Sequence, residues 1–311
     1  RADEAKLKAE GAAKVAEEKS NILRRAREYK EKMDRVVEIP PKLAAQTLLH
    51  SLRHFHWEKS AKLSNAHYHS IAFHVLHRMI EAQPDFQQRG VRTFTQSRLC
   101  RIFPSWNDAT KNQISNHDPI FPWSLGCQLV SMNYGSPDEQ LLASEGMFRR
   151  NASCGYVLKP PQLFGPRRER ELQRWSVKIL GAYHIPRAGS NGRRQNTLPI
   201  TPVIRLTLHS GEKGALPFTF ETRPSTSKGG DPLLYSEENL CSFDVGNAWV
   251  AMATFTVLDK SGEKNDFIAG AAVPVSCFQE GYRSVALFDA HHSRTGLFKF
   301  ASLLVHVTRM N

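Results

Sequence analysis

The second half of the chain is a succession of short apolar segments without a helical period, and this pattern restricts the fold more than any other feature. About eight such segments, separated by Gly, Ser, Asn and Pro turns, follow Pro161 in roughly 140 residues. This density of strands predicts an eight-stranded antiparallel β-sandwich. The segments are RWSVKILGAYHI, TPVIRLTLHS, LPFTFETR, NLCSFDV, AWVAMATFTVLD, DFIAGAAVPV, SVALFD and FASLLVHVTR.

The part before Pro161 mixes strand-like and helical patterns. Pro40 and Pro41 end any helix that precedes them, because proline lacks an amide donor and clashes with the turn before it. TLLHSLRHFHW alternates like a strand, and SIAFHVLHRMIEA, from Ser70 to Ala82, places its apolar residues mainly on one helical face before Pro84. SRLCRIFP and GCQLVSMNY are short apolar runs on either side of a polar loop. The order of strand, helix, strand, loop and strand predicts part of an α/β unit.

The segment NASCGYVLKP, residues 151–160, closes this part of the chain. Its apolar middle predicts a buried strand, and Pro160 and Pro161 predict the point at which that strand stops. Residues 162–172 supply turn-forming and charged residues but no core residue. We therefore expect a domain boundary there.

Residues 1–35 contain no proline and a single glycine, and acidic and basic residues recur at helical i, i+4 spacing. The apolar residues do not hold a heptad, so a solvated linker helix is favoured over a coiled coil. The chain begins with Arg1, without an initiator Met or a signal sequence. We therefore expect a processed or truncated chain.

Composition narrows the class of partner. Lys and Arg number 42 against 30 Asp and Glu, a formal charge of +12, which favours anionic partners such as nucleic acid, an acidic protein or a membrane surface. The five cysteines form no C-x-x-C pair, which indicates a reduced, cytosolic protein without a structural zinc site. The longest apolar run, WVAMATFTVL, is far shorter than the ~20 residues of a membrane span.

Histidines are concentrated near the start of the α/β part. Seven of the thirteen fall between His50 and His77, including His54 and His56 at alternate positions of the expected strand. Two such histidines could chelate zinc or copper, but no Cys or carboxylate stands at a matching spacing. Solvated or partner-facing histidines are therefore the favoured interpretation, and no metal site is predicted.

The short signatures of hydrolases, proteases and nucleotide-binding proteins do not occur in the sequence. Ser70, at the expected start of a helix, and Arg101, in a strand-like run, together suggest a phosphate cradle. Taken singly, Ser70 is equally well explained as a helix cap and Arg101 as a surface residue. The residues alone leave these alternatives open.

Four segments, in their order and approximate spacing, resemble the Y half of eukaryotic phosphoinositide-specific phospholipase C. They are SRLCRIFP, SNHDP, WSLGCQLVSMNY and CGYVLKP. The pair KNDFIAGAAVP and CFQEGYRSVALFD resembles the C2 domain that follows the Y half in that family. The resemblance covers residues 39–311. It implies half of a TIM-like (β/α)8 barrel followed by a C2-type sandwich.

The resemblance also implies a reaction and site residues. Enzymes of this family cleave the phosphodiester between diacylglycerol and the inositol phosphate headgroup. Their two catalytic histidines and a calcium ion belong to the X half, so no catalytic or metal-binding residue is expected in this chain. Ser70 and Arg101 match residues that hold headgroup phosphate. Phe103 stands where the family generally has a tyrosine that packs on the inositol ring.

C2 domains of the family usually bind calcium through aspartates on loops at one end. Thr201 stands where one aspartate is expected, and LDKSGEKND keeps Asp259 without the partner two residues on. A site short of carboxylates binds calcium weakly. We therefore expect this C2 domain to have a structural role.

Three parts are predicted: a charged helical linker in residues 1–38, the Y half in residues 39–162 and the C2 domain in residues 172–311. The predicted function is that of a phosphoinositide phospholipase C fragment, inactive without its X half. Its expected partners are phosphoinositide lipids, a membrane surface and that X half, and its expected location is cytoplasmic and peripherally membrane-associated. The alternative is a catalytically dead lipid-binding or scaffold protein. A nucleic-acid partner is not expected, since no recognition motif accompanies the charge.

Overall fold

The computed structural model describes residues 17, 20, 21, 24, 41–52, 57–60, 62–104, 115–164, 172–186, 200–211, 216–225, 237–261 and 265–310. The chain divides into two compact units, residues 1–50 and residues 51–311. The described part of the first unit contains the short helix α2 (Pro41–Ala44). The helix predicted over residues 1–35 lies outside the described residues, apart from four isolated positions.

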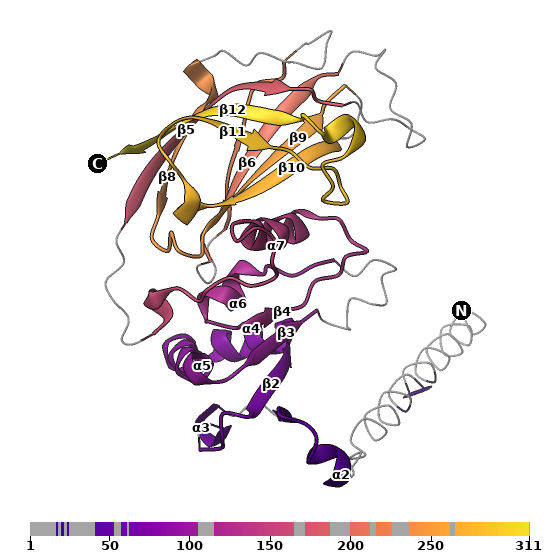
Figure 1. The fold of residues 1–311 in the computed structure, drawn as a ribbon, viewed down its shortest axis with the longest axis vertical. Helices are drawn as coiled ribbons and strands as arrows, with labels where there is room; N and C mark the ends of the chain where they lie inside the picture. Colours follow the sequence, from indigo (N-terminus) through magenta and orange to yellow (C-terminus); the bar gives the residue numbers. More distant parts are fainter. Residues whose placement is uncertain are drawn as a thin grey trace, which may run out of the picture. The chain divides into compact units, whose positions relative to one another are not determined.

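A four-stranded sheet begins at residue 50, with the strand order β1-β2-β3-β4 (Figure 1). β2 pairs with β3 in parallel, and β3 pairs with β4 in parallel. The strands are β1 (His50–Leu52), β2 (His67–Ala72), β3 (Cys100–Phe103) and β4 (Leu129–Val130). The helices of this region are α3 (Trp57–Ser60), α4 (Phe73–Ala82), α5 (Pro84–Ser97), α6 (Ile120–Ser124) and α7 (Glu139–Arg149).

Helices α4 and α5 cover one face of this sheet. Ile71 of β2 and Ile102 of β3 point into the same apolar cluster as Leu76 and Ile80 of α4 and Phe94 of α5. All five side chains are at most 6% exposed. Because strand side chains alternate between faces, every second residue of β2 and β3 is directed to the other face of the sheet.

The helix predicted from Ser70 to Ala82 begins three residues later than expected. Ser70 lies inside β2, and α4 begins at Phe73 with Ala72 at its N-cap position. The prediction that Ser70 caps the helix is therefore wrong. The physical reason is parallel pairing with β3, which draws residues 69–72 into the sheet; a local helical pattern does not reveal that long-range pairing.

Four helices of this region were not predicted: the short α3 and α6 and the longer α5 and α7. Pro84 is the first residue of α5 and does not end the structure there, which suits a proline at the first helical position. Helix α7 begins after Asp138, whose side chain accepts a hydrogen bond from the Leu141 amide at 2.9 Å. The predicted order of strand, helix, strand, loop and strand therefore omits α5 and α7.

The segment NASCGYVLKP is not a strand, contrary to the prediction. The Cys154 amide donates to the Asn151 carbonyl at 3.1 Å, and the two residues between them have φ values of 52° and 56°. This is the backbone of a tight turn that reverses the chain. Beyond it, Tyr156 is 80% and Leu158 is 88% exposed. A strand needs a neighbour to bind its backbone groups, and in the described residues this segment joins none of the sheets.

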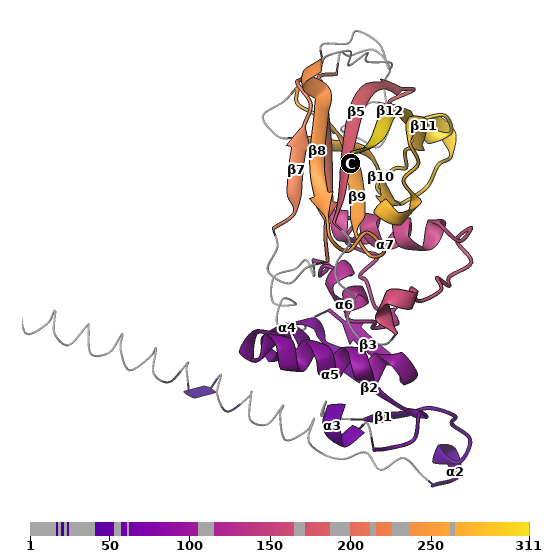
Figure 2. The ribbon, with the colours of Figure 1, turned by 90° about the vertical axis from the view of Figure 1, so that its left-hand side faces the viewer.

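The C-terminal part of the second unit is a sandwich of two four-stranded antiparallel sheets (Figures 1 and 2). One sheet has the order β10-β9-β6-β7 and the other β11-β12-β5-β8. Each of the apolar segments after Pro161 contains one of these strands. They are β5 (Gln173–Tyr183), β6 (Pro202–His209), β7 (Phe218–Glu221), β8 (Leu240–Val245), β9 (Met252–Asp259), β10 (Asp266–Pro274), β11 (Gly281–Ala286) and β12 (Ser302–Met310).

Strand β9 is buried along its whole length because both of its faces are covered. Phe255 and Val257 face the core between the two sheets. Met252 faces the other way and packs with Leu142 and Met147 of α7. A continuous apolar run, in place of an alternating one, is typical of a strand covered on both sides. Helix α7 therefore joins the parallel sheet region to the sandwich, together with Ile120 and Trp123 of α6, which belong to the same buried cluster.

The structure contains, within its described residues, no helix with the length and apolar character needed to cross a membrane.

Gly146 tests the contact between α7 and the sandwich. A Cβ atom at this position would lie 2.5 Å from the carbonyl oxygen of Ala272, closer than packed atoms approach. We expect Gly146→Ala to lower the free energy of unfolding by about 1–3 kcal/mol, although alanine is the better helix former. Urea unfolding measures the change.

Gly135→Ala is the matched control, because its nearest neighbour is the movable side-chain oxygen of Asn133 at 3.2 Å. We expect a change within about 0.5 kcal/mol for this variant. Equal stability of the two variants would contradict the close approach of α7.

Candidate functional site

The second face of the parallel sheet brings three predicted site residues together. In the pairing of β2 with β3, Ser70 lies opposite Arg101 and Ala72 lies opposite Phe103. By strand alternation these residues share the face opposite to the one that Ile71 buries. Arg101 is exposed, whereas Ser70 and Phe103 are partly buried. A hydroxyl, a guanidinium and an aromatic ring therefore stand side by side.

The Arg101 side chain is held by two neighbours. Its Nε donates a hydrogen bond to Ser131 Oγ at 3.0 Å. Its guanidinium carbon lies 5.5 Å from the centroid of the Phe103 ring, within the range of a cation–π contact. Both neighbours orient a group that binds planar oxyanions well. This face can therefore bind a phosphate next to an apolar ring.

The C-terminal end of α5 fixes the position of β3 behind this face. Gln128 Nε2 donates to the carbonyls of Thr95 at 2.9 Å and Arg98 at 3.0 Å, while its Oε1 accepts from the Cys100 amide at 2.9 Å. The Lys159 ammonium also donates to the Thr95 carbonyl, at 2.5 Å. Partial burial lowers the pKa of Lys159. Two side chains thus satisfy carbonyls that a helix end leaves without partners.

Gly126 permits this close packing. Its φ of +81° lies in the left-handed region, and a Cβ atom there would lie 2.6 Å from Thr95 Oγ1. The Thr95 hydroxyl donates to the carbonyl of Leu125 at 2.8 Å. The sequence GCQ therefore has a structural role: its glycine makes the turn and its glutamine binds the helix end.

Asn116 ties the SNHDP segment to the loop after β4. Its amide side chain donates to the carbonyls of Asn133 and Ser136, each at 3.0 Å, and to Asp138 Oδ1 at 3.1 Å. Its Oδ1 accepts from the Asn133 amide. Asn116 is 9% exposed, so these bonds are shielded from water. This network shapes the edge of the sheet at which β2, β3 and β4 end.

His117 is a residue at this edge that the sequence analysis did not identify. Its ring stacks on Phe73, the first residue of α4, with centroids 4.6 Å apart. Burial lowers the pKa of His117 to about 4, and the nearby Asp138 carboxylate offsets only part of that shift. His117 is therefore neutral near pH 7 and acts as an aromatic packing group.

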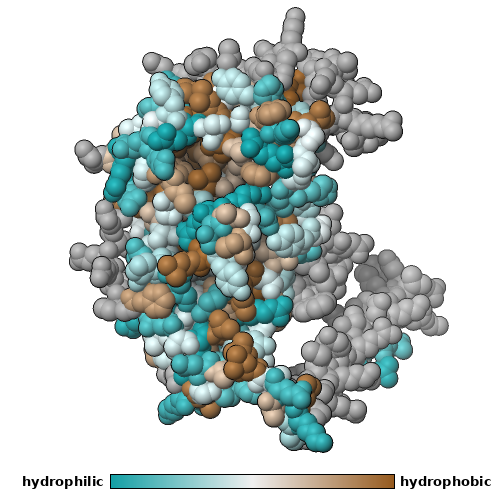
Figure 3. All heavy atoms as spheres, viewed as in Figure 1, coloured by the Kyte–Doolittle hydropathy of each residue, from teal (hydrophilic) through white to brown (hydrophobic). Residues whose placement is uncertain are grey.

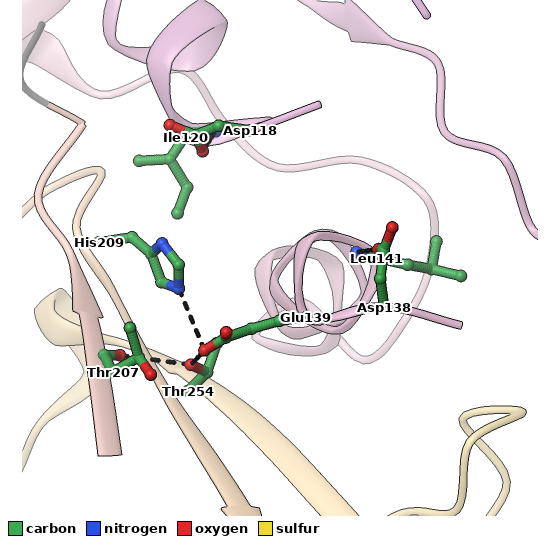
Figure 4. A network of polar contacts seen from close by, with 8 residues as sticks. All are labelled: Asp118, Ile120, Asp138, Glu139, Leu141, Thr207, His209 and Thr254. Carbon is green, nitrogen blue, oxygen red and sulfur yellow. Dashed lines mark hydrogen bonds and ion pairs between the residues drawn. The ribbon is translucent and has the colours of Figure 1, made fainter. Parts of the chain in front are cut away.

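A polar network joins α7 to the sandwich (Figure 4). His209 of β6 lies with Nε2 3.4 Å from Glu139 Oε1, and the Thr254 hydroxyl of β9 donates to the same oxygen. Thr254 also lies 3.3 Å from the carbonyl of Thr207. His209 is 5% exposed, so the network is largely removed from water. A partly exposed carboxylate with two hydrogen-bond partners thus fixes how α7 packs on the sandwich.

The two carboxyl groups around His209 respond differently to this environment. Burial alone would raise the pKa of Glu139, but hydrogen bonds from His209 and Thr254 outweigh it and lower the pKa to about 2. Burial raises the pKa of Asp118, although the Ile120 amide donates to its Oδ1 at 2.9 Å. Glu139 is therefore charged at neutral pH.

The histidines between residues 50 and 77 do not form a cluster in the described part of the chain. His54 and His56 lie outside the described residues. His69 is buried with Nε2 2.7 Å from Ser60 Oγ, and His77 pairs with Glu81 at 3.3 Å. Among the described residues, no group of three His, Cys, Asp or Glu side chains is placed to hold a metal ion.

At the far end of β9, Asp259 and Thr201 lie side by side. Asp259 Oδ1 accepts hydrogen bonds from the amides of Thr201 at 3.0 Å and Ser261 at 2.9 Å. The carboxylate is thus engaged by the backbone of its own loop. Residues 187–199 and 262–264, which belong to the adjacent loops, lie outside the described residues.

Comparison with known proteins accounts for the arrangement of the two regions. Residues 43–162 match the family described as phosphatidylinositol-specific phospholipase C, Y domain. The chain matches the C-terminal part of a phosphoinositide-specific phospholipase C. One relative, from Bos taurus, is named 1-phosphatidylinositol 4,5-bisphosphate phosphodiesterase delta-4. It is 30% identical to this chain over 273 residues, and the alignment covers 83% of this chain and 31% of the relative.

Another relative of this chain has a different name. The Inactive phospholipase C-like protein 2 of Mus musculus is 30% identical over 226 residues, covering 68% of this chain and 19% of its own length. Among solved structures, L. pealei PLC21 aligns with a TM-score of 0.71 at 21% identity, covering 94% of this chain and 36% of that one. The shared fold is that of a phospholipase barrel half followed by a C2-type sandwich. The chain therefore spans about a third or less of these relatives.

Glu139 gives the stability of this chain a predictable pH dependence. A carboxyl whose pKa falls from its ordinary 4.5 to about 2 on folding stabilises the folded state above pH 4.5, and this contribution is lost as the pH falls toward 2. We expect Glu139→Gln to be less stable than the wild type at neutral pH and to lose less stability between pH 4.5 and 2. Urea unfolding at several pH values measures both effects.

Glu81→Gln on α4 is the matched control, because the Glu81 side chain is 53% exposed. It should leave the pH profile unchanged. An unaltered profile for Glu139→Gln would contradict a charged Glu139 at the interface.

Proposed function

We propose that this chain is the Y half and C2 domain of a phosphoinositide phospholipase C and that its Y half binds the phosphorylated inositol headgroup. The observation that carries the proposal is the register of β2 and β3, which sets Ser70 beside Arg101 on one face. The Arg101 guanidinium and the Ser70 hydroxyl would donate hydrogen bonds to headgroup phosphate. Ser70 and Arg101 do not belong to one short sequence motif; the parallel pairing of β2 with β3 brings them together.

Phe103 would provide the apolar side of the headgroup site. It lies next to Arg101 on the same strand face, so one ligand can contact both side chains. Its ring face offers a packing surface for the carbons of an inositol ring, but it has no hydroxyl to donate a further hydrogen bond. We therefore propose a site in which phosphate contacts supply most of the affinity.

The chemical step would require the X half of the same enzyme. In the proposed reaction the inositol 2-hydroxyl attacks phosphorus and diacylglycerol leaves, while the histidines and the calcium ion of the X half move the proton and offset the charge. The exposed Tyr156 and Leu158, which follow the turn after α7, would be covered by that half.

The domain arrangement proposed here consists of a linker in residues 1–38, the Y half in residues 39–162 and the C2 domain in residues 172–311. We further propose a cytoplasmic enzyme that associates peripherally with membranes, because its substrate would be a lipid. The C2 domain would act mainly by holding the Y half through α7. Calcium would be required by the X half. In the C2 domain, Asp259 Oδ1 is already engaged by backbone amides, which disfavours a calcium site there.

A second function, a catalytically dead phospholipase-like scaffold, is favoured by one observation. A relative named Inactive phospholipase C-like protein 2 is as similar to this chain, at 30% identity, as the Bos taurus phosphodiesterase. The headgroup site would then serve for binding alone. Producing the chain together with the X half of the Bos taurus relative separates the two: inositol phosphate release supports the enzyme, and binding without release supports the scaffold.

Arg101→Gln tests the headgroup site directly. We expect the wild-type chain to bind vesicles that contain phosphatidylinositol 4,5-bisphosphate and the variant to bind them about tenfold more weakly, because a charge-assisted hydrogen bond is lost. Arg78→Gln, an exposed arginine on α4, is the matched control and should bind like the wild type. Co-sedimentation with vesicles measures the three affinities.

Two results would overturn the proposal. One is wild-type binding by Arg101→Gln. The other is rapid release of inositol phosphate by the chain alone in the presence of calcium, since we expect no turnover without the X half.

A further inference from the structure

The connection between β11 and β12 presents apolar side chains between cationic ones. Leu297 is 51% and Phe300 is 63% exposed, and Arg294 and Lys299 are exposed beside them. Residues 290–301 contain two cations, two histidines and no Asp or Glu. The Lys299 ammonium lies 5.4 Å from the centroid of the Phe300 ring. We refer to residues 294–300 as the 294–300 loop.

The acidic residue just before this region is engaged by backbone amides. Asp289 Oδ1 accepts hydrogen bonds from the amides of His291 at 2.9 Å and Ser293 at 2.8 Å. Its carboxylate therefore stabilises the turn that precedes the loop. The outward-facing charges of residues 290–301 are positive.

The 294–300 loop is fixed to the sandwich at both ends. Phe298, the last residue of the short 3₁₀ helix η5 (Gly296–Phe298), is 6% exposed and belongs to the sandwich core. The Leu287 amide donates to the Ala301 carbonyl at 3.0 Å, which closes the connection at its base. The exposure of Leu297 and Phe300 is thus a consequence of Phe298 pointing inward, because neighbouring side chains cannot all face the core.

The connection is also joined to the Y half. The guanidinium carbon of Arg149, at the end of α7, lies 3.5 Å from the centroid of the Phe288 ring, and the same group donates to the His292 carbonyl at 3.4 Å. On the other side, the Phe300 ring lies 6.1 Å from His184, at the end of β5. The loop therefore has a defined position in the same unit as the headgroup site.

We propose that the 294–300 loop inserts Leu297 and Phe300 into the surface of an anionic phospholipid membrane, with Lys299 and Arg294 at the lipid phosphates. The inference rests on the membrane association proposed above and names the residues that produce it. Apolar side chains and interleaved cations on one ordered loop are the combination that interfacial binding requires. In Figure 3, hydrophobic and hydrophilic side chains lie interleaved over the sandwich surface.

The absence of acidic residues from 290–301 favours a lipid surface over a protein partner or a second copy of the chain. A second copy would place two positively charged loops against each other or against a mixed surface, whereas an anionic membrane complements every charge on the loop. Lysine and arginine stems also reach from an apolar level to the phosphate level. A lipid surface is therefore the occupant to test.

The test uses the whole 311-residue chain and vesicles that lack phosphoinositides. Flotation is compared for phosphatidylcholine vesicles with and without phosphatidylserine. We expect the wild type to prefer the vesicles with phosphatidylserine. Phe300→Ala should bind these about tenfold more weakly through lost apolar burial, and Lys299→Gln about fivefold more weakly through lost charge.

Leu216→Ala is the matched control, since Leu216 is 90% exposed in another loop of the sandwich. It should bind the vesicles like the wild type, and thermal unfolding should show all variants folded. Equal flotation of Phe300→Ala and the wild type would overturn the proposal. A change in oligomeric state for Phe300→Ala without a change in flotation would overturn it too, in favour of self-association.

The headgroup site is tested separately with a soluble inositol phosphate. Phe300→Ala should bind that ligand like the wild type, because the loop does not contribute to the β2–β3 face. Loss of vesicle binding with intact headgroup binding supports the loop proposal. Arg101→Gln should bind the soluble inositol phosphate more weakly and should still bind the phosphatidylserine vesicles that lack phosphoinositides. Failure of one proposal is therefore distinguishable from failure of the other.

Discussion

The interaction on which the headgroup face depends is the binding of the α5 C-terminus by Gln128 and Lys159. Gln128 joins two helix carbonyls to the amide of Cys100, the first residue of β3. The helix end and the strand start are thereby held at one place, and Arg101 follows as the next residue. Leaving these buried groups without partners would cost about 1–3 kcal/mol each. The motifs GCQ and CGYVLKP therefore have a structural role: they position the strand that carries Arg101, the side chain proposed to bind phosphate.

Helix α7 gives the same chain its second constraint. It covers the outer face of β9, so the central strand of one sandwich sheet is buried on both sides. The Glu139 carboxylate accepts from Thr254 and pairs with His209, and these polar contacts fix the position of α7 on the apolar surface. Because α7 belongs to the Y region and the strands to the sandwich, the two regions behave as one compact unit. A loop on the sandwich and a site on the parallel sheet are thus kept in a fixed relation.

The sequence predicted those parts of the fold that depend on local patterns. The apolar segments after Pro161 each contain a strand, and the run around Arg101 is β3. The predictions that failed depend on partners far away in the chain. Residues 70–72 have a helical pattern but pair with β3, and residues 151–160 have a strand pattern but join no sheet among the described residues. Both errors have one physical cause, since a β-strand is specified by its neighbour as much as by its own sequence.

The candidate site could be predicted only in part for the same reason. Family resemblance selected Ser70, Arg101 and Phe103, but only the register of β2 and β3 shows that Ser70 stands beside Arg101. The stacking of His117 on Phe73 could not be predicted, because the two residues are 44 positions apart in the chain and no short motif links them. Ser131, which orients Arg101, was not predicted either, because it lies 30 positions away in the chain.

The central claim is that Ser70 and Arg101 bind one phosphate together. A double-mutant cycle with Ser70→Ala and Arg101→Gln, measured by calorimetry with a soluble inositol trisphosphate, tests it most directly. If both side chains contact the same group, the account predicts a coupling energy of about 1 kcal/mol or more between the two substitutions. Strictly additive effects, or binding that neither substitution weakens, would contradict it.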